Sequence, residues 1–359
     1  MQPLGIAIGL PEVAAGVMAL ALTAYVLMAG ADFGGGVWDL LARGPRRARQ
    51  RSLVAHAIGP IWEANHVWLI LVVVLLFTCF PAAFARLSTV LHIPITLMLI
   101  GIVLRGSAFV FRAYDPQRDR AGRRWGMTFA IASTVTPVLL GVSLGALASG
   151  AVGRVPLEGP DVARLTFADR FVAPWATPFA FAVGAMTLAL FAFLAAVYLT
   201  VEAAERRGGS PETARRLADD FRARALGAGV ALFVTAWVAF LTAPDGPGSV
   251  RGVVEGGGWA AFLQGLTAAT GGAAMLALWT RRWRVARAAA QAQAACVVWG
   301  WAWTQFPLLV PPDGTIRALA APAITLQLSL GALAAGTAIL LPSFVYLFRV
   351  FKAPAVREG

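Results

Sequence analysis

Charged residues are scarce in this sequence. Only 13% of its 359 residues are charged, whereas 58% are hydrophobic, and the mean hydropathy is +0.71. A soluble domain of this length needs far more polar surface, so the composition excludes an ordinary water-soluble globular protein. Long apolar runs instead predict helices that cross a lipid bilayer, because about 20 apolar residues span its hydrocarbon core.

Histidine and cysteine are also few, which argues against metal or haem binding by this chain. The 3 histidines are His56, His66 and His92, and the 2 cysteines are Cys79 and Cys296. They form neither a CxxC motif nor a Cys/His cluster. His56 and His66 would lie about 15 Å apart along one helix, so they cannot face each other across a haem. We therefore predict no haem or metal ligands in this chain.

Basic residues gather in alternate connections between the apolar segments. Nine segments are expected to cross the membrane: 11–37, 53–80, 88–111, 125–149, 175–200, 225–242, 258–279, 286–306 and 321–348. Four alternate connections and the C-terminal tail hold 23 of the 30 Lys and Arg residues. Because such residues mark the cytoplasmic side, we predict an outer N-terminus and a cytoplasmic C-terminus. The net charge of +12 then reflects topology rather than nucleic-acid binding.

The fold class predicted is an all-α, polytopic membrane protein made of two four-helix bundles and a peripheral helix. Helices joined by short connections pack as antiparallel neighbours. We expect the first bundle at 1–150, an outer connecting loop at 151–174 and the second bundle at 175–310. Residues 311–359 are expected to form the ninth helix and a cytoplasmic tail.

A few polar and ionisable residues interrupt these apolar segments. Each ionisable group at bilayer depth costs about 2.5–3.5 kcal/mol or more, so it faces a protein interior or a water-filled cavity. Glu63 and His66, in "GPIWEANHVWLI", are three residues apart and share a helix face. The pattern fits either a buried charge network that fixes helix packing or a proton relay entered from the cytoplasm. The candidate proton-pathway residues are Asp32, Glu63, Asn65, His66, Trp68 and Arg105.

The same residues lie in motifs that resemble subunit II of the cytochrome bd-type quinol oxidases. The motifs are "GADFGGG" (Gly30–Gly36), "GPIWEANHVWLI" (Gly59–Ile70), "RGSAFVFR" (Arg105–Arg112) and "WAWTQFPLLVP" (Trp301–Pro311). The resemblance implies a bacterial inner-membrane heterodimer with a haem-bearing subunit I, which holds haems b and d-type. That complex oxidises quinol and reduces oxygen to water with cytoplasmic protons, and subunit II supplies part of the proton route. No catalytic residue or cofactor is then expected in this chain.

Two positions depart from many relatives of that family. Ala29 stands where they have an acid, so a route through the first helix would depend on Asp32 alone. His66 stands where they have glutamine, which adds a titratable group beside Glu63. A proton-coupled secondary transporter is the alternative function, and a purely structural subunit is a third. The identity of the quinone, a small accessory subunit and a structural quinone or lipid are left open.

Overall fold

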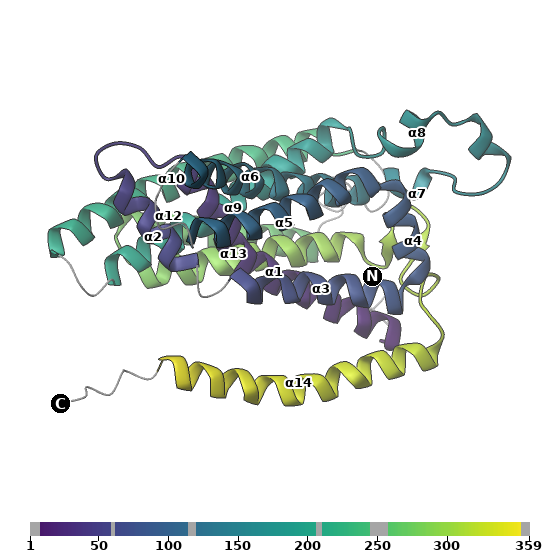
Figure 1. The fold of residues 1–359 in the computed structure, drawn as a ribbon. Coiled ribbons are helices and arrows are strands. Elements are labelled where there is room, and N and C mark those ends of the chain that lie inside the picture. Colours follow the sequence, from purple (N-terminus) through teal and green to yellow (C-terminus); the bar gives the residue numbers. More distant parts are fainter. Residues whose placement is uncertain (1–7, 59–61, 114–119, 206–209, 245–257, 353–359) are drawn as a thin grey trace.

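The computed structural model describes residues 8–58, 62–113, 120–205, 210–244 and 258–352, and Figure 1 shows a bundle of long helices. These helices are α1 (Leu10–Leu40), α3 (Trp62–Cys79), α5 (His92–Ala113), α6 (Arg120–Ala148), α9 (Pro178–Glu205), α10 (Pro211–Thr242), α12 (Trp259–Trp279), α13 (Trp283–Gln305) and α14 (Ala323–Lys352). Within the described ranges, seven helices are long and apolar enough to cross a membrane, or eight with one bent pair. A multi-pass helical membrane protein is thus confirmed, while the number nine stays a prediction.

The expected second segment, 53–80, is not one uninterrupted helix. It begins within α2 (Arg47–Ile58), passes through residues 59–61, which lie outside the described residues, and continues as α3. α3 then meets α4 (Pro81–Val90) at a bend of 117°. Pro81 explains the bend, because proline lacks the amide hydrogen that would continue the helical hydrogen bonds. α4 leads into α5 at the same end of the molecule (Figure 1).

The expected outer loop, 151–174, contains short helices. They are α7 (Ala151–Arg154), the 3₁₀ helix η1 (Pro160–Arg164) and α8 (Phe167–Phe171). At the start of α8, the Thr166 amide and hydroxyl both donate to the Asp169 carboxylate, which lowers the pKa of Asp169. This connection therefore contains regular secondary structure, although its sequence has no long apolar run.

A small β-hairpin departs from the all-helical prediction. β1 (Leu308–Val310) pairs antiparallel with β2 (Gly314–Thr315) just before α14. The intervening residues are Pro311, Pro312 and Asp313, and such Pro/Asp/Gly sequences favour tight turns. β1 lies within the "WAWTQFPLLVP" motif, and the hairpin follows the end of α13.

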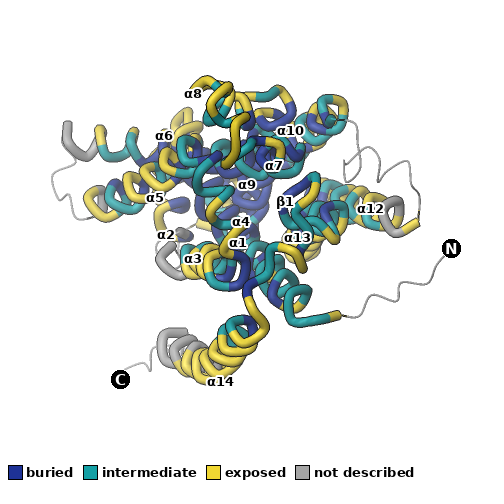
Figure 2. The backbone as a smooth tube through the Cα atoms, turned by 90° about the vertical axis from the view of Figure 1, so that its right-hand side faces the viewer, coloured by how far each residue is buried: buried dark blue, intermediate teal, exposed yellow. Residues whose placement is uncertain are grey.

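α9 occupies the centre of the bundle. It packs against α10, α6, α1 and α13, and its buried residues include Phe191, Phe193 and Leu199. Figure 2 shows this buried centre and, apart from it, the largely exposed α14, which contacts α1 and α3. α1 and α6 of the expected first bundle and α10 and α13 of the expected second bundle all pack on α9. The division of the chain into two bundles at 151–174 therefore stays a prediction.

Glycines allow α1 to approach its neighbours closely. A Cβ atom on Gly34 would collide with the backbone carbonyl of Phe191 in α9, and one on Gly36 would collide with Ser133 in α6. Small residues at helix interfaces permit this approach in lipid, where packing rather than hydrophobic burial drives association. The "GADFGGG" motif therefore sets the distance of α1 from α9 and α6.

We expect Gly34→Ala to lower the thermal stability of the detergent-solubilised protein. The added methyl meets backbone rather than a flexible side chain, and overpacking of this kind costs about 1–3 kcal/mol or more. Gly16→Ala is the matched control, because a Cβ on Gly16, also in α1, meets nothing within 4 Å. Equal thermal midpoints for the two variants would contradict the close contact between α1 and α9.

Candidate functional site

A buried ion pair joins α1 to α5. Arg105 donates from Nη2 to the Asp32 carboxylate, and the two side chains are only 1% and 3% exposed. The Nε of Arg105 also donates to the Ser133 hydroxyl of α6 at 3.2 Å. A charge removed from water is tolerated only when it is paired and hydrogen-bonded. The pair and its hydroxyl partner therefore hold three helices in one arrangement.

Two aromatic rings lie against the guanidinium group of Arg105. Its Cζ is 4.6 Å from the centroid of the Phe33 ring and 5.2 Å from that of the Phe129 ring. A cation over an aromatic face is stabilised by about 0.5–2 kcal/mol, depending on desolvation. Phe33 follows Asp32 in α1, so one short stretch of α1 supplies both the anion and a ring to Arg105.

α3 brings further polar groups to the same part of α1. Asn65 donates from Nδ2 to the Met28 carbonyl at 3.3 Å, and Trp68 donates from Nε1 to the Met28 sulfur at 3.1 Å. The His66 ring lies edge-on to Phe33, with centroids 6.2 Å apart. Met28 and Asp32 are one helical turn apart, so these residues surround a single level of α1.

Several buried polar atoms around this ion pair have no hydrogen-bond partner within the described part of the chain. They are Asp32 Oδ2, Asn65 Oδ1, His66 Nδ1, Arg105 Nη1 and Thr136 Oγ1. Nearly all buried polar atoms in proteins bond to protein groups or to ordered water. These five atoms come from four helices, so a water molecule bound near them would find polar partners on several sides.

The structure thus brings together five of the six residues predicted for a proton pathway. Asp32, Asn65, His66, Trp68 and Arg105 all lie around α1 at the ion pair. Glu63 belongs to the first turn of α3, and its side chain lies outside the described residues. That these residues form one constellation is a finding, whereas their part in proton transfer remains a prediction.

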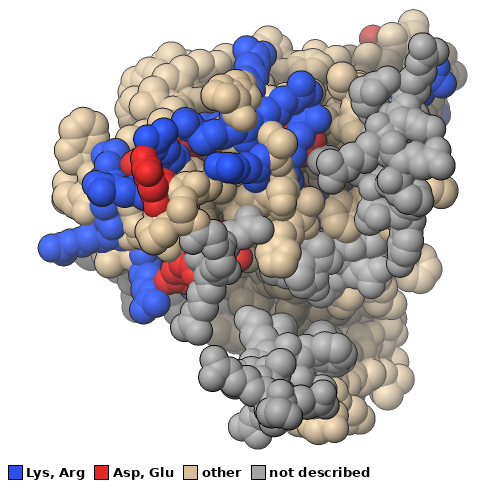
Figure 3. Space-filling view, turned by 60° about the vertical axis from the view of Figure 1, so that its left-hand side comes forward, with Lys and Arg blue, Asp and Glu red and all other residues tan. Residues whose placement is uncertain are grey.

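Arginine side chains gather at one end of the molecule, where α2 and the start of α10 lie (Figure 3). Arg46 donates two hydrogen bonds to Asp220, at 2.7 and 2.6 Å, and this bonding raises the pKa of Arg46. α1 begins at the opposite end and α14 ends at the arginine-rich end (Figure 1). The two helices therefore lie as expected for an outer N-terminus and a cytoplasmic C-terminus, which stays a prediction.

Comparison with known families identifies the chain. The sequence model described as cytochrome bd terminal oxidase subunit II matches residues 10–351. The chain belongs to this family. The resemblance carried by the motifs of α1, α3 and α5 is therefore confirmed over nearly the whole length.

Individual relatives are more distant than the family match. The cytochrome bd ubiquinol oxidase subunit 2 of Bacillus subtilis is 29% identical over 133 residues, which cover 37% of this chain and 38% of that protein. The cytochrome bd-I ubiquinol oxidase subunit 2 of Escherichia coli K12 is 27% identical over 154 residues, covering 43% and 39%. The matched stretch thus spans about two fifths of each relative's length.

A solved structure shows the same fold. The bd oxidase from Geobacillus thermodenitrificans contains a chain that superposes with a TM-score of 0.69 at 19% identity. The match covers 96% of this chain and 99% of that one. The helical arrangement described above is therefore that of a chain in a bd oxidase.

The histidines of this bd-family chain have separate surroundings. His66 contacts Phe33 at the ion pair, whereas His92 lies 3.0 Å from the Thr89 carbonyl and packs on Phe171 of α8. His56 is exposed in α2. Within the described ranges, no three His, Cys, Asp or Glu residues gather as a metal site would require. The side chains present do not fit a haem held between two histidines of this subunit.

Sequence reasoning missed three polar residues near the constellation. Asp39, which is 1% exposed, lies seven residues after Asp32 and 3.7 Å from Arg51. The seven-residue spacing places Asp39 on the same face of α1 as Asp32 and could have identified it. Ser133 and Thr136 of α6 carry no such signal, because hydroxyl residues occur throughout membrane helices.

Proposed function

We propose that this chain is subunit II of a bd-type quinol oxidase in the bacterial cytoplasmic membrane. It pairs there with a haem-bearing subunit I, and the complex oxidises quinol and reduces oxygen to water. The observation that carries the proposal is the family match over residues 10–351. The names of the sequence relatives, which are ubiquinol oxidase subunits, support the substrate class. Haems b and d-type are assigned to subunit I.

The contribution of this chain, in our proposal, is part of the route by which cytoplasmic protons enter the complex. Asp39 lies in the last turn of α1, at the arginine-rich end of the molecule, and Asp32 lies two helical turns closer to the middle of α1. Seven residues of helix span about 10 Å, too far for one hydrogen bond, so water molecules would connect the two carboxylates. Carboxylates, histidines and internal water are the groups that carry protons through membrane proteins.

The ion pair has a definite role in this proposal. Arg105 binds one oxygen of Asp32, while Oδ2 has no partner among the described residues. An ionised carboxylate accepts at both oxygens, so the second oxygen is available to a water molecule or a proton. Glu63, three residues before His66 on α3, would receive the proton on the way towards subunit I.

Co-purification tests the proposed function. When a tagged version of this chain is purified from cells that produce the whole complex, we expect a coloured haem protein in stoichiometric amount. The chain produced alone should show no haem absorption, because its histidines do not converge. A stable, colourless protein that carries no haem partner from either source would overturn the oxidase assignment and favour the proton-coupled transporter.

A further inference from the structure

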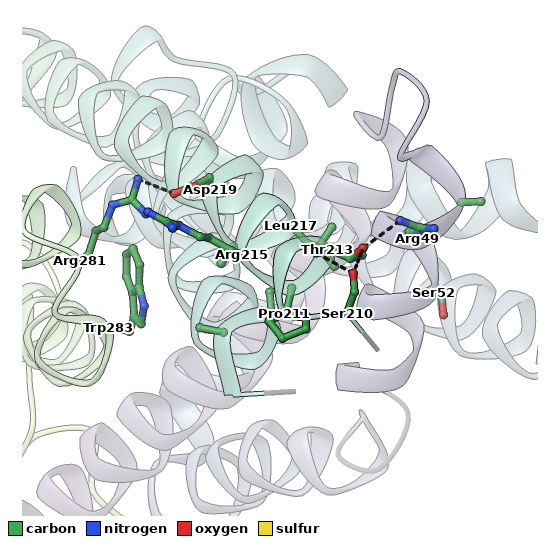
Figure 4. Close-up of a pocket in the computed structure, with 15 residues that line it drawn as sticks. Arg49, Ser52, Ser210, Pro211, Thr213, Arg215, Leu217, Asp219, Arg281 and Trp283 are labelled. Carbon is green, nitrogen blue, oxygen red and sulfur yellow. Dashed lines mark hydrogen bonds and ion pairs between the residues drawn. The ribbon is translucent and has the colours of Figure 1, made fainter. Parts of the chain in front are cut away.

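A cavity of about 890 Å³ opens at the arginine-rich end of the molecule (Figure 4). Its walls come from α2, the end of α9, the start of α10 and the start of α13. The volume lies within the range of about 300–1,000 Å³ typical of small-molecule sites. None of the residues that line this cavity belongs to the ion-pair constellation around Asp32 and Arg105.

The charges that line the cavity are unbalanced. The lining residues include three arginines, Arg49, Arg215 and Arg281, but a single carboxylate, that of Asp219. Arg281 lies 3.1 Å from Asp219, and Arg49 donates to the Thr213 hydroxyl at 3.4 Å. Arg215 has no ion pair with any residue that the structure describes. The lining therefore carries a net of two positive charges.

The neutral groups complement these charges. Hydroxyl groups of Ser52, Ser210 and Thr213 lie on the side of Arg49, while Trp283 lies on the side of Arg281 (Figure 4). Leu217 and Ala218, each 4% exposed, supply an apolar floor. Guanidinium and hydroxyl donors match the oxygens of phosphate, and a tryptophan at a helix end is typical of the membrane–water interface.

We propose that this cavity binds a phosphate-bearing anion at the inner membrane surface, with Arg215 and Arg281 as its main charged ligands. Basic pockets between membrane helices on the cytoplasmic side are suited to the headgroups of anionic lipids. A soluble phosphate compound presents the same oxygen atoms. The site does not depend on the proposed oxidase function, because it shares no residue with the ion-pair constellation.

Binding to the purified, delipidated complex tests this proposal. Phosphatidylglycerol, phosphatidylcholine, inorganic phosphate and ATP are titrated separately, and native mass spectrometry and thermal denaturation report occupancy. We expect saturable binding of phosphatidylglycerol but not of phosphatidylcholine. Each of Arg215→Gln and Arg281→Gln should weaken that binding about fivefold, and the double variant about 25-fold, from the usual contribution of one basic residue at a membrane surface.

Arg216→Gln is the matched control. Arg216 adjoins Arg215 on α10, pairs with Glu212 at the surface and does not line the cavity. An equal loss of binding in Arg216→Gln and Arg215→Gln would show diffuse surface attraction and overturn the site, as would binding unaffected by either change. Binding of phosphate or ATP alone, lost in the Arg215 and Arg281 variants, would uphold the site and identify a soluble source. If the double variant fails to assemble, the single Arg215→Gln variant decides.

Discussion

Arg105→Met will abolish stable folding of the chain, and adding Asp32→Asn to it will restore part of the lost stability. Arg105 is 1% exposed and neutralises a carboxylate that is itself 3% exposed. Removing one partner of such a pair leaves an uncompensated buried charge, at a cost of about 3–5 kcal/mol. Methionine fills similar space, so the loss will come from the unpaired charge rather than from a cavity.

A double-mutant cycle measures this effect. The fraction of monodisperse protein in detergent and its thermal midpoint are compared for the wild type, both single variants and the double variant, since contacting residues give non-additive effects. Arg164→Met is the control, because Arg164 pairs with Asp161 on the surface with 81% of its side chain exposed. If Arg105→Met proves as stable as Arg164→Met, the ion pair does not hold α1, α5 and α6 together.

The sequence predicts a buried charge network as one of two interpretations, because the bilayer restricts what an ionisable residue can do. Asp32 and Arg105 stand in different apolar segments at related depths, and opposite charges buried in a membrane interior pair with one another. The sequence left open which residues pair within such a network and which third helix joins them. Ser133 gives no clear sequence signal, because hydroxyl groups in helices commonly bond to their own backbone, as Thr134 does to the Ala130 carbonyl at 2.9 Å.

The bend between α3 and α4 escaped prediction for a different reason. The residues around Phe80 are apolar on both sides, so hydropathy alone extends the second segment to the bend and gives no sign of α4. Pro81 alone indicates a break there, since proline at that position interrupts the helical hydrogen bonds. The angle of 117° then depends on how α4 packs against α5, α7 and α8, which the local sequence does not determine.

The cavity lined by Arg49, Arg215 and Arg281 could not be predicted from the sequence of any single connection. Arg49, Arg215 and Arg281 come from three separate arginine-rich connections, and each alone indicates only the cytoplasmic side. Their convergence follows from the packing of α2, α10 and α13 around the end of α9. A cavity formed by such long-range contacts is visible only in the folded chain.

The proton route predicts a second large effect, at Glu63. Glu63→Gln keeps the shape of the side chain but removes its titratable proton. We expect the complex to assemble with normal haem content while quinol-driven oxygen consumption falls by about a hundredfold, the lower end of the effect of removing a positioned proton carrier. Glu63→Asp should recover part of the rate, because it restores the carboxylate at a slightly different reach.

Haem content measured beside the rate separates proton transfer from packing at Glu63. A packing role predicts that glutamine, which has nearly the same volume, either supports the wild-type rate or lowers haem content and rate together. Glu205→Gln makes the same chemical change at the surface, where Glu205 pairs with Arg284, and should leave both quantities unchanged. A slow, fully assembled Glu63→Gln complex beside a normal Glu205→Gln complex is therefore the result that only a titrating carboxylate in α3 predicts.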